Sequence, residues 1–280
     1  MSVYQIITDK ILEYLKHGVV PWKQPFVKGL LPRNFVTNRQ YSGINLFLLN
    51  MGQFASPFWL TFKQIQANGG SIRKGEKATQ IIFCKTYKVE EEKEGEIKIK
   101  NSMSMRYYWV FNLCQVDGIP EQPLPAREMK DPIQACEDVV LQMPLRPEIR
   151  NIQSQPYYNP NEDYVNIPNS SAFESSETYY STLFHELTHS SGHPSRLNRS
   201  TIKTISPFGS HEYSKEELIA EMGSAFLCAH TGISQSTIEN SASYISGWLR
   251  VLNNDPMMVI QASAQAQKAA HYILGEGNSE

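Results

Sequence analysis

The feature that most restricts the fold of this chain is the stretch STLFHELTHSSG, in which His185 and His189 stand four positions apart. Residues four apart lie one turn from each other on the same face of an α-helix. A serine pair before the stretch can cap such a helix, and Gly192 can end it in a left-handed turn. The sequence therefore predicts a helix over about residues 176–191, with both imidazoles on one stripe.

Two imidazoles on one helical stripe can bind a single metal ion, and Glu186 lies beside them in the pattern H-E-x-x-H. In a hydrolytic zinc site such a glutamate accepts a proton from the attacking water and later passes it to the leaving amine. The alternative is two surface or core histidines beside a capping carboxylate, because five-residue patterns have many chance matches. The helical context and the acids downstream favour the metal site.

The third ligand is expected from the stretch SKEELIAEM at residues 214–222. Glu217 and Glu221 are one helical turn apart, so one can bind the metal while the other orients a histidine through its second ring nitrogen. We favour Glu217 as the ligand, and we expect Glu216 to be solvated. The alternative role for Glu217 is a capping box with Ser214, in which the carboxylate serves the helix end.

Other residues near the motif have narrower roles. The metzincin signature begins in the same way, but Ser195 stands where that signature requires a third histidine. Tyr213 or His211 can donate a hydrogen bond to an oxyanion. His193 can line the cleft or cap the last carbonyls of the helix. We expect an extended peptide substrate to lie along an edge strand in DYVNIP, residues 163–168.

Charge and aromatic residues are distributed unevenly along the chain. Residues 1–118 contain 16 Lys and Arg against 9 Asp and Glu, whereas residues 119–280 contain 10 Lys and Arg against 19 Asp and Glu. Residues 1–118 also contain 17 of the 30 aromatic residues. Stacking rings in a cationic groove bind single-stranded nucleic acid, because every base has a π face and every phosphate a charge. The alternative is that the rings fill the core of this half. The candidates for contact with single-stranded DNA are Trp22, Lys23, Arg39, Tyr41, Trp59, Arg73, Lys74 and Lys77.

The proline-rich segment GIPEQPLPAREMKDP separates the two parts and has the composition of a connector. We therefore expect two domains, over residues 1–118 and 133–280, joined by a linker over 119–132. No apolar run is long enough for a membrane span, and the N-terminus lacks the order of a signal peptide, so we expect a cytoplasmic protein with no membrane partner. The four scattered cysteines favour reduced thiols.

Both parts are expected to mix helices and strands, which makes the fold class α+β. In the first part, TQIIFCKTYKV and SMRYYWVFNLCQV predict a hairpin whose solvated tip lies at residues 90–100. In the second, mainly helical part, PYYNPNEDYVNIP predicts two short strands around a turn. The other helices are predicted over about residues 2–17, 43–50, 61–69, 132–143, 214–231, 238–253 and 256–274.

A resemblance to a known family runs through nearly the whole chain. PWKQP, PRNFVTNRQYSGIN, WLTFKQI, KGEKA and VFNLCQVDG resemble the N-terminal domain of ArdC-type antirestriction proteins. FHELTHSSGHPSRLNR, FGSHEYSKEELIAEMGSAFL and AQKAAHYIL resemble the C-terminal zincin-like metallopeptidase domain of that family. The motifs also occur in the order of the family.

This resemblance implies an antirestriction protein of a mobile element such as a conjugative plasmid. It implies an N-terminal domain that binds single-stranded DNA and a C-terminal domain that binds a metal. It makes His185, His189 and Glu217 the metal ligands, as in the gluzincins, in which the two histidines of H-E-x-x-H and a later glutamate bind the metal. It also makes Glu186 the catalytic acid-base and places Glu221 behind the ligands.

Two functions remain open from the sequence. The first is a metallopeptidase of unknown substrate that is tethered to DNA. The second is a non-enzymatic protein that binds and protects single-stranded DNA, in which the metal only cross-links two helices. Two histidines and a carboxylate suit zinc best, although manganese and iron are chemically possible.

Overall fold

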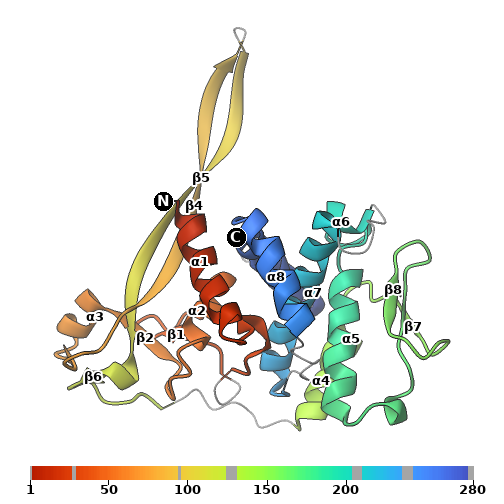
Figure 1. Ribbon diagram of the computed structural model, residues 1–280, viewed down its shortest axis with the longest axis horizontal. Helices are drawn as coiled ribbons and strands as arrows, with labels where there is room; N and C mark the ends of the chain where they lie inside the picture. The colour runs from red at the N-terminus through yellow and green to blue at the C-terminus, as the bar shows by residue number, and fades with distance from the viewer. Residues whose placement is uncertain are drawn as a thin grey trace.

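The computed structural model describes residues 2–26, 30–93, 96–123, 131–203, 210–234 and 242–276. Figure 1 shows an N-terminal part with a long hairpin beside a mainly helical C-terminal part. Both parts mix helices and strands, so the chain has the predicted two-domain α+β fold. The predicted domain bounds stay predictions, and residues 124–130 of the predicted linker lie outside the described residues.

The N-terminal part contains a four-stranded sheet in the order β1-β2-β5-β4, in which β1 and β2 are parallel and the other pairs antiparallel. A short 3-10 helix, Pro21–Lys23, follows the first helix, and a second sheet pairs β3 with β6. The elements are α1 (Val3–Lys16), β1 (Arg33–Asn34), α2 (Ile44–Asn50), β2 (Phe58–Thr61), α3 (Phe62–Ala67), β3 (Ser71–Ile72), β4 (Thr79–Lys93), β5 (Glu96–Asn112) and β6 (Val116–Asp117).

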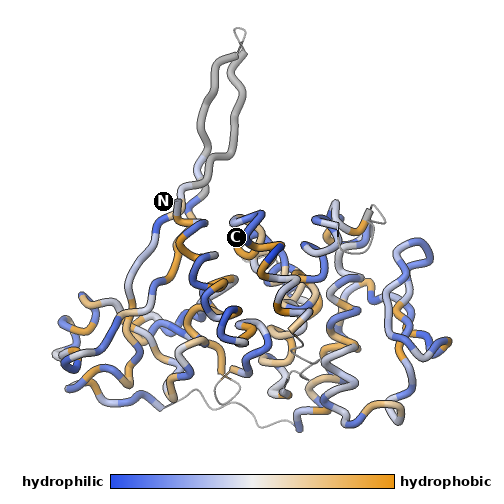
Figure 2. Tube along the Cα trace, in the orientation of Figure 1, coloured by the Kyte–Doolittle hydropathy of each residue, from blue (hydrophilic) through white to orange (hydrophobic). Residues whose placement is uncertain are grey.

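The local signals of this part are confirmed where helices begin and end. Ser2 caps α1, and Gly18 follows it with a φ of 78°. Thr61 caps α3 in a capping box with Gln64, and Gly69 takes a φ of 75° just beyond it. Apolar and polar residues alternate along α1 (Figure 2), which buries one face of an amphipathic helix.

The hairpin of β4 and β5 is longer than the sequence predicts. Its strands pair from Thr79 opposite Val110 out to Lys93 opposite Glu96. The predicted extent of the tip, residues 90–100, is therefore wrong, because residues 90–93 and 96–100 are paired strand and only residues 94 and 95 of this stretch lie outside the described residues. The stretch EIKIK alternates isoleucine with charged residues, and that period of two is a strand pattern despite the high charge.

The C-terminal part consists of helices around a three-stranded sheet in the order β7-β9-β8. Its longer helices and the two strands around the turn at residues 160–163 confirm the predicted elements, whereas α6 and β7 are not predicted from the sequence. Residues 238–241 of the helix predicted over 238–253 lie outside the described residues. The elements are α4 (Pro132–Gln142), β7 (Glu148–Arg150), β8 (Tyr157–Asn159), β9 (Tyr164–Asn166), α5 (Ser176–Ser190), α6 (Ser200–Lys203), α7 (His211–Thr231), α8 (Ala242–Asn254) and α9 (Met258–Ile273).

Two details of this part differ from the prediction. The stretch DYVNIP contains β9, which is the central strand because β7 pairs with its other side, so the predicted edge position is wrong. The edge strand beside the helices is β8. In addition, α7 begins at His211 and is capped by Ser210, which accepts a hydrogen bond from the backbone of Tyr213. Ser214 is thus inside the helix and makes no capping box with Glu217.

The two parts share one hydrophobic core. Phe47 of α2 stacks on Phe226 of α7 with ring centroids 5.0 Å apart. Ile7 and Ile11 of α1 belong to the same buried cluster as Leu252 of α8. The shared core fixes the N-terminal part against the helices of the C-terminal part.

Within the described residues, no helix combines the length and apolar character that a bilayer crossing requires.

Close packing of α5 on α7 brings the two halves of the candidate site together. Gly223 of α7 faces Thr188 of α5, and a Cβ at position 223 would lie 2.5 Å from Thr188 Cγ2 and 2.8 Å from its Oγ1. Thr188 is fully buried, so it has no space into which it can move. Only glycine permits this helix separation without a shift of the backbone.

We therefore expect Gly223→Ala to destabilise the protein by about 1–3 kcal/mol, because the added methyl overpacks the α5–α7 contact. Gly247→Ala is the matched control, since no heavy atom lies within 4 Å of the Cβ it would add in α8. There the change should stabilise the helix by about 0.5–1 kcal/mol. Urea denaturation of both variants measures the two effects, and equal stability of Gly223→Ala and the wild type would contradict the packing argument.

Candidate metal centre

Helix α5 presents the two histidines of the motif side by side. Ser175 caps the helix by accepting a hydrogen bond from the backbone of Thr178. The Nε2 atoms of His185 and His189 lie 3.1 Å apart, and their rings meet edge to face. The predicted helix and its histidine stripe are confirmed, but Gly192 does not have a positive φ, so the predicted left-handed end of the helix is wrong.

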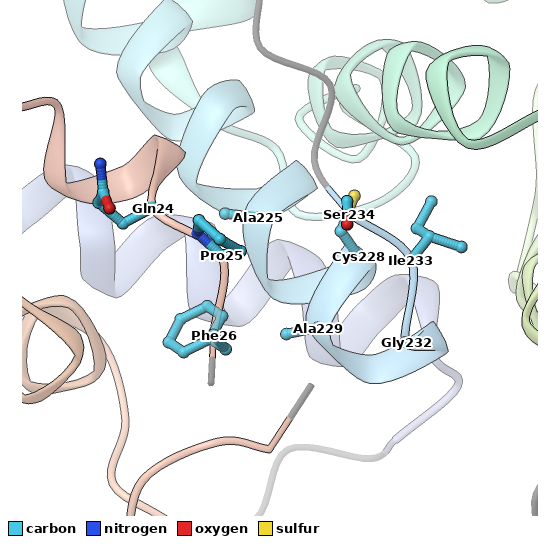
Figure 3. A pocket seen from close by; sticks show the side chains of 9 residues that line it. All are labelled: Gln24, Pro25, Phe26, Ala225, Cys228, Ala229, Gly232, Ile233 and Ser234. Carbon is cyan, nitrogen blue, oxygen red and sulfur yellow. The ribbon is translucent and has the colours of Figure 1, made fainter. Parts of the chain in front are cut away.

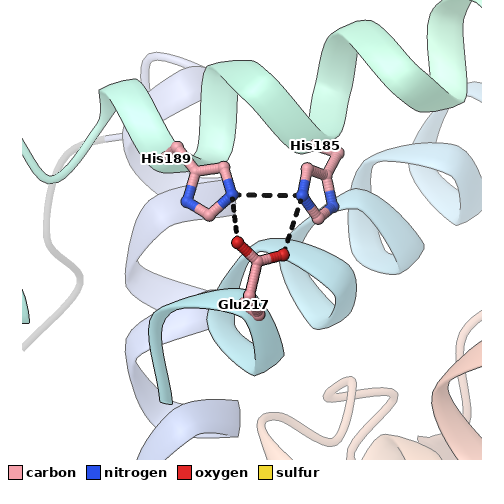
Figure 4. Close-up of side chains that lie close together, drawn as sticks. All are labelled: His185, His189 and Glu217. Carbon is pink, nitrogen blue, oxygen red and sulfur yellow. Dashed lines mark hydrogen bonds and ion pairs between the residues drawn. The ribbon is translucent and has the colours of Figure 1, made fainter. Parts of the chain in front are cut away.

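Helix α7 brings Glu217 to these two nitrogens (Figure 4). Glu217 Oε2 lies 3.5 Å from His185 Nε2, and its Oε1 lies 3.6 Å from His189 Nε2. One donor atom from each of the three residues falls within 4.8 Å of the others. Ligands of a tetrahedral ion bound at 2.0–2.1 Å lie about 3.3 Å apart, so this donor set fits a divalent cation such as Zn²⁺.

The electrostatics around Glu217 favour its charged form. Burial raises the pKa of its carboxyl, but the hydrogen bond to His185 and the charges of the two histidines lower it to about 2 overall. For His189, burial lowers the pKa, but the hydrogen bond to Glu216 and the nearby carboxylates raise it to about 9. The carboxylates of Glu186, Glu216 and Glu217 thus surround His189 with negative charge, which favours a cation at this position.

Glu216 is buried behind His189, and the prediction that it is solvated is wrong. Its Oε1 lies 3.3 Å from His189 Nδ1 and accepts a hydrogen bond of 2.6 Å from Arg199 Nη2. Thr201 also donates to Glu216. The loop after α5 returns to α7 and carries Arg199 there, which the sequence pattern could not show. Glu216 is thus placed to fix the ring of His189 through its second nitrogen.

Glu221, predicted to orient a histidine, accepts hydrogen bonds from Trp22 and Tyr244. It lies one turn after Glu217 on α7, close enough for the charge of His185 to lower its pKa against the stronger effect of burial, which raises it. Its role as the orienting group stays a prediction. The hydrogen bond between a carboxylate and His189 comes from Glu216 instead.

An open cleft of about 510 Å³ lies over the three donor atoms. One wall is made by Tyr157 and Tyr158 of β8 and the prolines that flank them. Glu186 lines the cleft beside the histidines and is 7% exposed. The cleft thus leaves room for a substrate next to both the metal ligands and a carboxylate.

Tyr213 also lines this cleft, whereas His211 does not. Burial, followed by the charge of Glu217 and a hydrogen bond to it, raises the pKa of Tyr213 to about 12. The phenol therefore keeps its proton at neutral pH and can act as a donor. His211 is half exposed, and its Nε2 lies 2.9 Å from Asp255 Oδ2. His193 contacts Ser195 and Asp163 rather than the cleft.

Three of the eight residues predicted to contact DNA are buried. The exposed fractions of Trp22, Lys23 and Trp59 are 0%, 5% and 2%. Their predicted exposure is wrong, because Pro21–Lys23 packs against α7 and β2 lies inside the N-terminal sheet. These side chains are not available to a DNA strand.

The other five predicted contacts lie at or near the surface. Arg39, Lys74 and Lys77 are exposed and Tyr41 is half-buried. Arg73 is exposed and donates a 2.7 Å hydrogen bond to Asp117.

Sequence reasoning missed a cluster of exposed rings on the hairpin. Tyr107, Tyr108 and Trp109 of β5 are 46%, 44% and 52% exposed, and Phe83 of β4 is 57% exposed. Tyr107 meets Trp109 edge to face on one side of the hairpin, and Phe83 meets Tyr108. The signal was available, because side chains alternate between the two faces of a strand and three consecutive rings cannot all enter one core.

Two known protein families match the chain. Residues 1–111 match the N-terminal domain of anti-restriction factor ArdC, and residues 139–265 match the zincin-like metallopeptidases. Two crystal structures of the antirestriction protein ArdC of plasmid R388 are each 33% identical to the chain. The metal-free structure has a TM-score of 0.77 and covers 99% of this chain and 98% of its own. The Mn(II)-bound structure has a TM-score of 0.76 and covers 100% of both.

Curated relatives include proteins of different lengths. DNA primase TraC of Escherichia coli is 32% identical over an alignment of 296 positions, which covers 97% of this chain but only 27% of the primase. The protein y4eC of Sinorhizobium fredii (strain NBRC 101917 / NGR234) is 29% identical over an alignment of 285 positions and is covered to 91%. The chain thus corresponds to a minor part of the primase and to nearly all of y4eC.

We expect Glu216→Ala to destabilise the protein by about 3–5 kcal/mol, because it leaves the buried guanidinium of Arg199 without its carboxylate. Glu212→Ala is the control, since Glu212 lies on the same helix but is half exposed. That change should alter stability by less than about 0.5 kcal/mol. Thermal and urea unfolding measure both, and similar losses in the two variants would show that the buried pair has no special role.

Proposed function

Because this chain belongs to the ArdC antirestriction family, we propose that it binds single-stranded DNA through its N-terminal part and hydrolyses peptide bonds at the metal centre of its C-terminal part. The observation that supports peptide hydrolysis is the convergence of His185, His189 and Glu217 beneath an open cleft that Glu186 also lines. The proposal includes a mobile-element origin, action in the cytoplasm and a role in helping incoming DNA escape restriction.

The donor set supports a divalent cation as the cofactor. Two imidazole nitrogens and one carboxylate, with a further position open to the cleft, are the ligands of catalytic rather than structural zinc sites. The ArdC protein of plasmid R388 has been crystallised with Mn(II), so manganese is the second candidate after zinc. A cation bound here would act as a Lewis acid on a carbonyl oxygen and on a water molecule.

The side chains around the cleft supply proton transfer, stabilisation of the oxyanion and positioning of the metal ligands. Glu186 takes the proton of the attacking water and delivers it to the leaving amine, as its position beside both histidines allows. Tyr213 keeps its proton, and once its O–H turns from Glu217 towards the cleft it donates a hydrogen bond to the oxyanion that forms on the carbonyl. Glu217 completes the ligand set and Glu216 holds the ring of His189.

The edge strand β8 is the element that can hold an extended peptide. It lies on the cleft wall, and its outer edge pairs with no strand among the described residues. A peptide added along such an edge receives backbone hydrogen bonds, while the rings of Tyr157 and Tyr158 contact its side chains.

The exposed hairpin rings support single-stranded DNA as the partner of the N-terminal part. Tyr107, Tyr108 and Trp109 offer π faces for stacking of bases. Arg106 and Lys85 are exposed on the face of the hairpin that also carries Phe83 and Tyr108, where they can neutralise phosphates, whereas Tyr107 and Trp109 lie on the opposite face. The exposed rings on the two faces of this hairpin, rather than the buried Trp22 and Trp59, are the proposed base-stacking sites.

A second candidate function is a DNA-protecting protein whose metal is structural. The observation that favours it is that the three donors come from two helices, α5 and α7, which a metal would cross-link. In that case Glu186 has no chemical role, and the protein acts through its DNA surface alone. The two candidates differ in what happens when only the glutamate is changed.

Glu186→Gln should retain the metal and lose antirestriction, because the amide cannot accept the proton of water; general-base loss costs about 10²–10⁴-fold in rate. Elemental analysis gives the metal content, and the efficiency of transfer of unmodified DNA into a restricting host gives the activity. Glu177→Gln, an exposed change on the same helix, is the control and should behave as the wild type. Full activity of Glu186→Gln would favour the DNA-protecting function.

Trp109→Ala should weaken binding of a fluorescent oligothymidine by about 1–3 kcal/mol, since one stacked base loses its partner. Trp109→Phe keeps an aromatic ring and should retain most of the affinity. Fluorescence anisotropy at a fixed, low salt concentration measures both, because phosphate contacts make affinity depend strongly on salt. Unchanged affinity of Trp109→Ala would remove this ring from the DNA surface.

A further inference from the structure

A buried contact joins the N-terminal part to the helix that carries Glu217. Trp22 Nε1 donates a 2.6 Å hydrogen bond to Glu221 Oε2, and the two residues are 199 positions apart in the chain. Tyr244 of α8 donates to the same oxygen. The carboxylate of Glu221 is therefore held from two sides, by residues of two different elements.

Lys23 adds a cation to this contact. Its Nζ lies 3.9 Å from the centroid of the Tyr244 ring, and only 5% of the residue is exposed. Burial lowers the pKa of Lys23, while the charge of Glu221 acts in the opposite direction. A lysine with so little exposure needs a compensating partner, and here the partners are the carboxylate of Glu221 and the face of Tyr244.

The surrounding packing limits the freedom of this contact. Trp22 is fully buried and meets Trp248 of α8 edge to face, with ring centroids 5.5 Å apart. The chain beyond Lys23 continues along α7, where Pro25 and Phe26 face Ala225 and Ala229 across a cavity of about 80 Å³ (Figure 3). The N-terminal segment is thus packed along α7 from Glu221 towards its C-terminal end.

The position of Glu221 connects this contact to the metal centre. Glu221 follows Glu217 by one helical turn, so both carboxylates point from the same side of α7. The donor atoms of Glu217 must stay about 3.3 Å from those of the histidines to share an ion at 2.0–2.1 Å. A rotation or axial shift of α7 by a fraction of an ångström would spoil that geometry.

From this geometry we propose that Trp22 and Lys23 are positioning residues for the metal centre, holding through Glu221 the turn of α7 that presents Glu217. The proposal rests on the proposed function, because it requires that His185, His189 and Glu217 bind a cation. The N-terminal part is then a structural component of the metal site as well as a DNA-binding surface. Loss of the contact lowers metal affinity even though Trp22 touches no metal ligand.

The test measures the affinity of the full chain for Zn²⁺ and for Mn²⁺ by competition with a chromophoric chelator. Trp22→Phe keeps a ring of similar shape but removes the N–H donor. It should weaken metal affinity about tenfold, the lower end of the loss seen when partners of metal ligands are removed. Trp59→Phe is the matched control, because Trp59 is equally buried in the N-terminal part but belongs to a separate cluster. It should leave affinity within about twofold of the wild type.

Two further variants separate the possible results. Tyr244→Phe removes the other donor to Glu221 and should weaken metal affinity in the same direction, so the proposal stays testable if Trp22→Phe does not fold. Glu217→Gln should abolish tight metal binding if the proposed metal centre is correct. Wild-type affinity in both Trp22→Phe and Tyr244→Phe, together with loss in Glu217→Gln, would overturn the positioning role and leave the metal centre intact. A wild-type chain that binds neither ion would overturn both.

Discussion

The arrangement of the site depends on how closely α5 packs on α7. His185 and His189 come from one helix and Glu217 from the other, so a shared ion requires a short separation between the two helices. Gly223 makes this possible, because the side chain of Thr188 occupies the space that any Cβ at that position would need. The ligand set follows from this contact, and β8 adds one wall of the cleft above it.

Helix α7 shows how surroundings decide the role of a carboxylate. Glu216, Glu217 and Glu221 share one helix, but each meets different partners. Arg199 and His189 surround Glu216, both histidines face Glu217, and Trp22 and Tyr244 hold Glu221. Because unpaired buried charges are strongly unfavourable, each carboxylate is fixed by its partners, and together they fix the helix. The metal centre is therefore supported from the loop after α5, from α8 and from the N-terminal part.

Composition predicted a nucleic-acid surface in the first half of the chain, but it could not identify the exposed rings. Trp22 and Trp59 fill the interior, whereas Tyr107, Tyr108 and Trp109 are exposed on β5, next to the residues that pair with β2. The hairpin of β4 and β5 extends from the sheet (Figure 1). The exposure of these three rings follows from the alternation of faces along β5 and from the position of β4 at the edge of the sheet. An aromatic residue counts in the composition in the same way whether it lies in the core or at the surface.

The sequence alone determined the local features of this protein. Caps, glycine stops and apolar periodicity predicted α1, α3 and α5, and the spacing of His185 and His189 placed both imidazoles on one stripe. These features depend on residues a few positions apart, and the geometry of a helix sets the relative positions of such residues. Tertiary structure decided which acid orients His189, which rings are exposed and how the N-terminal part reaches Glu221. Those outcomes depend on burial between segments as distant as Trp22 and Glu221, and burial is a property of the packed chain that no local pattern contains.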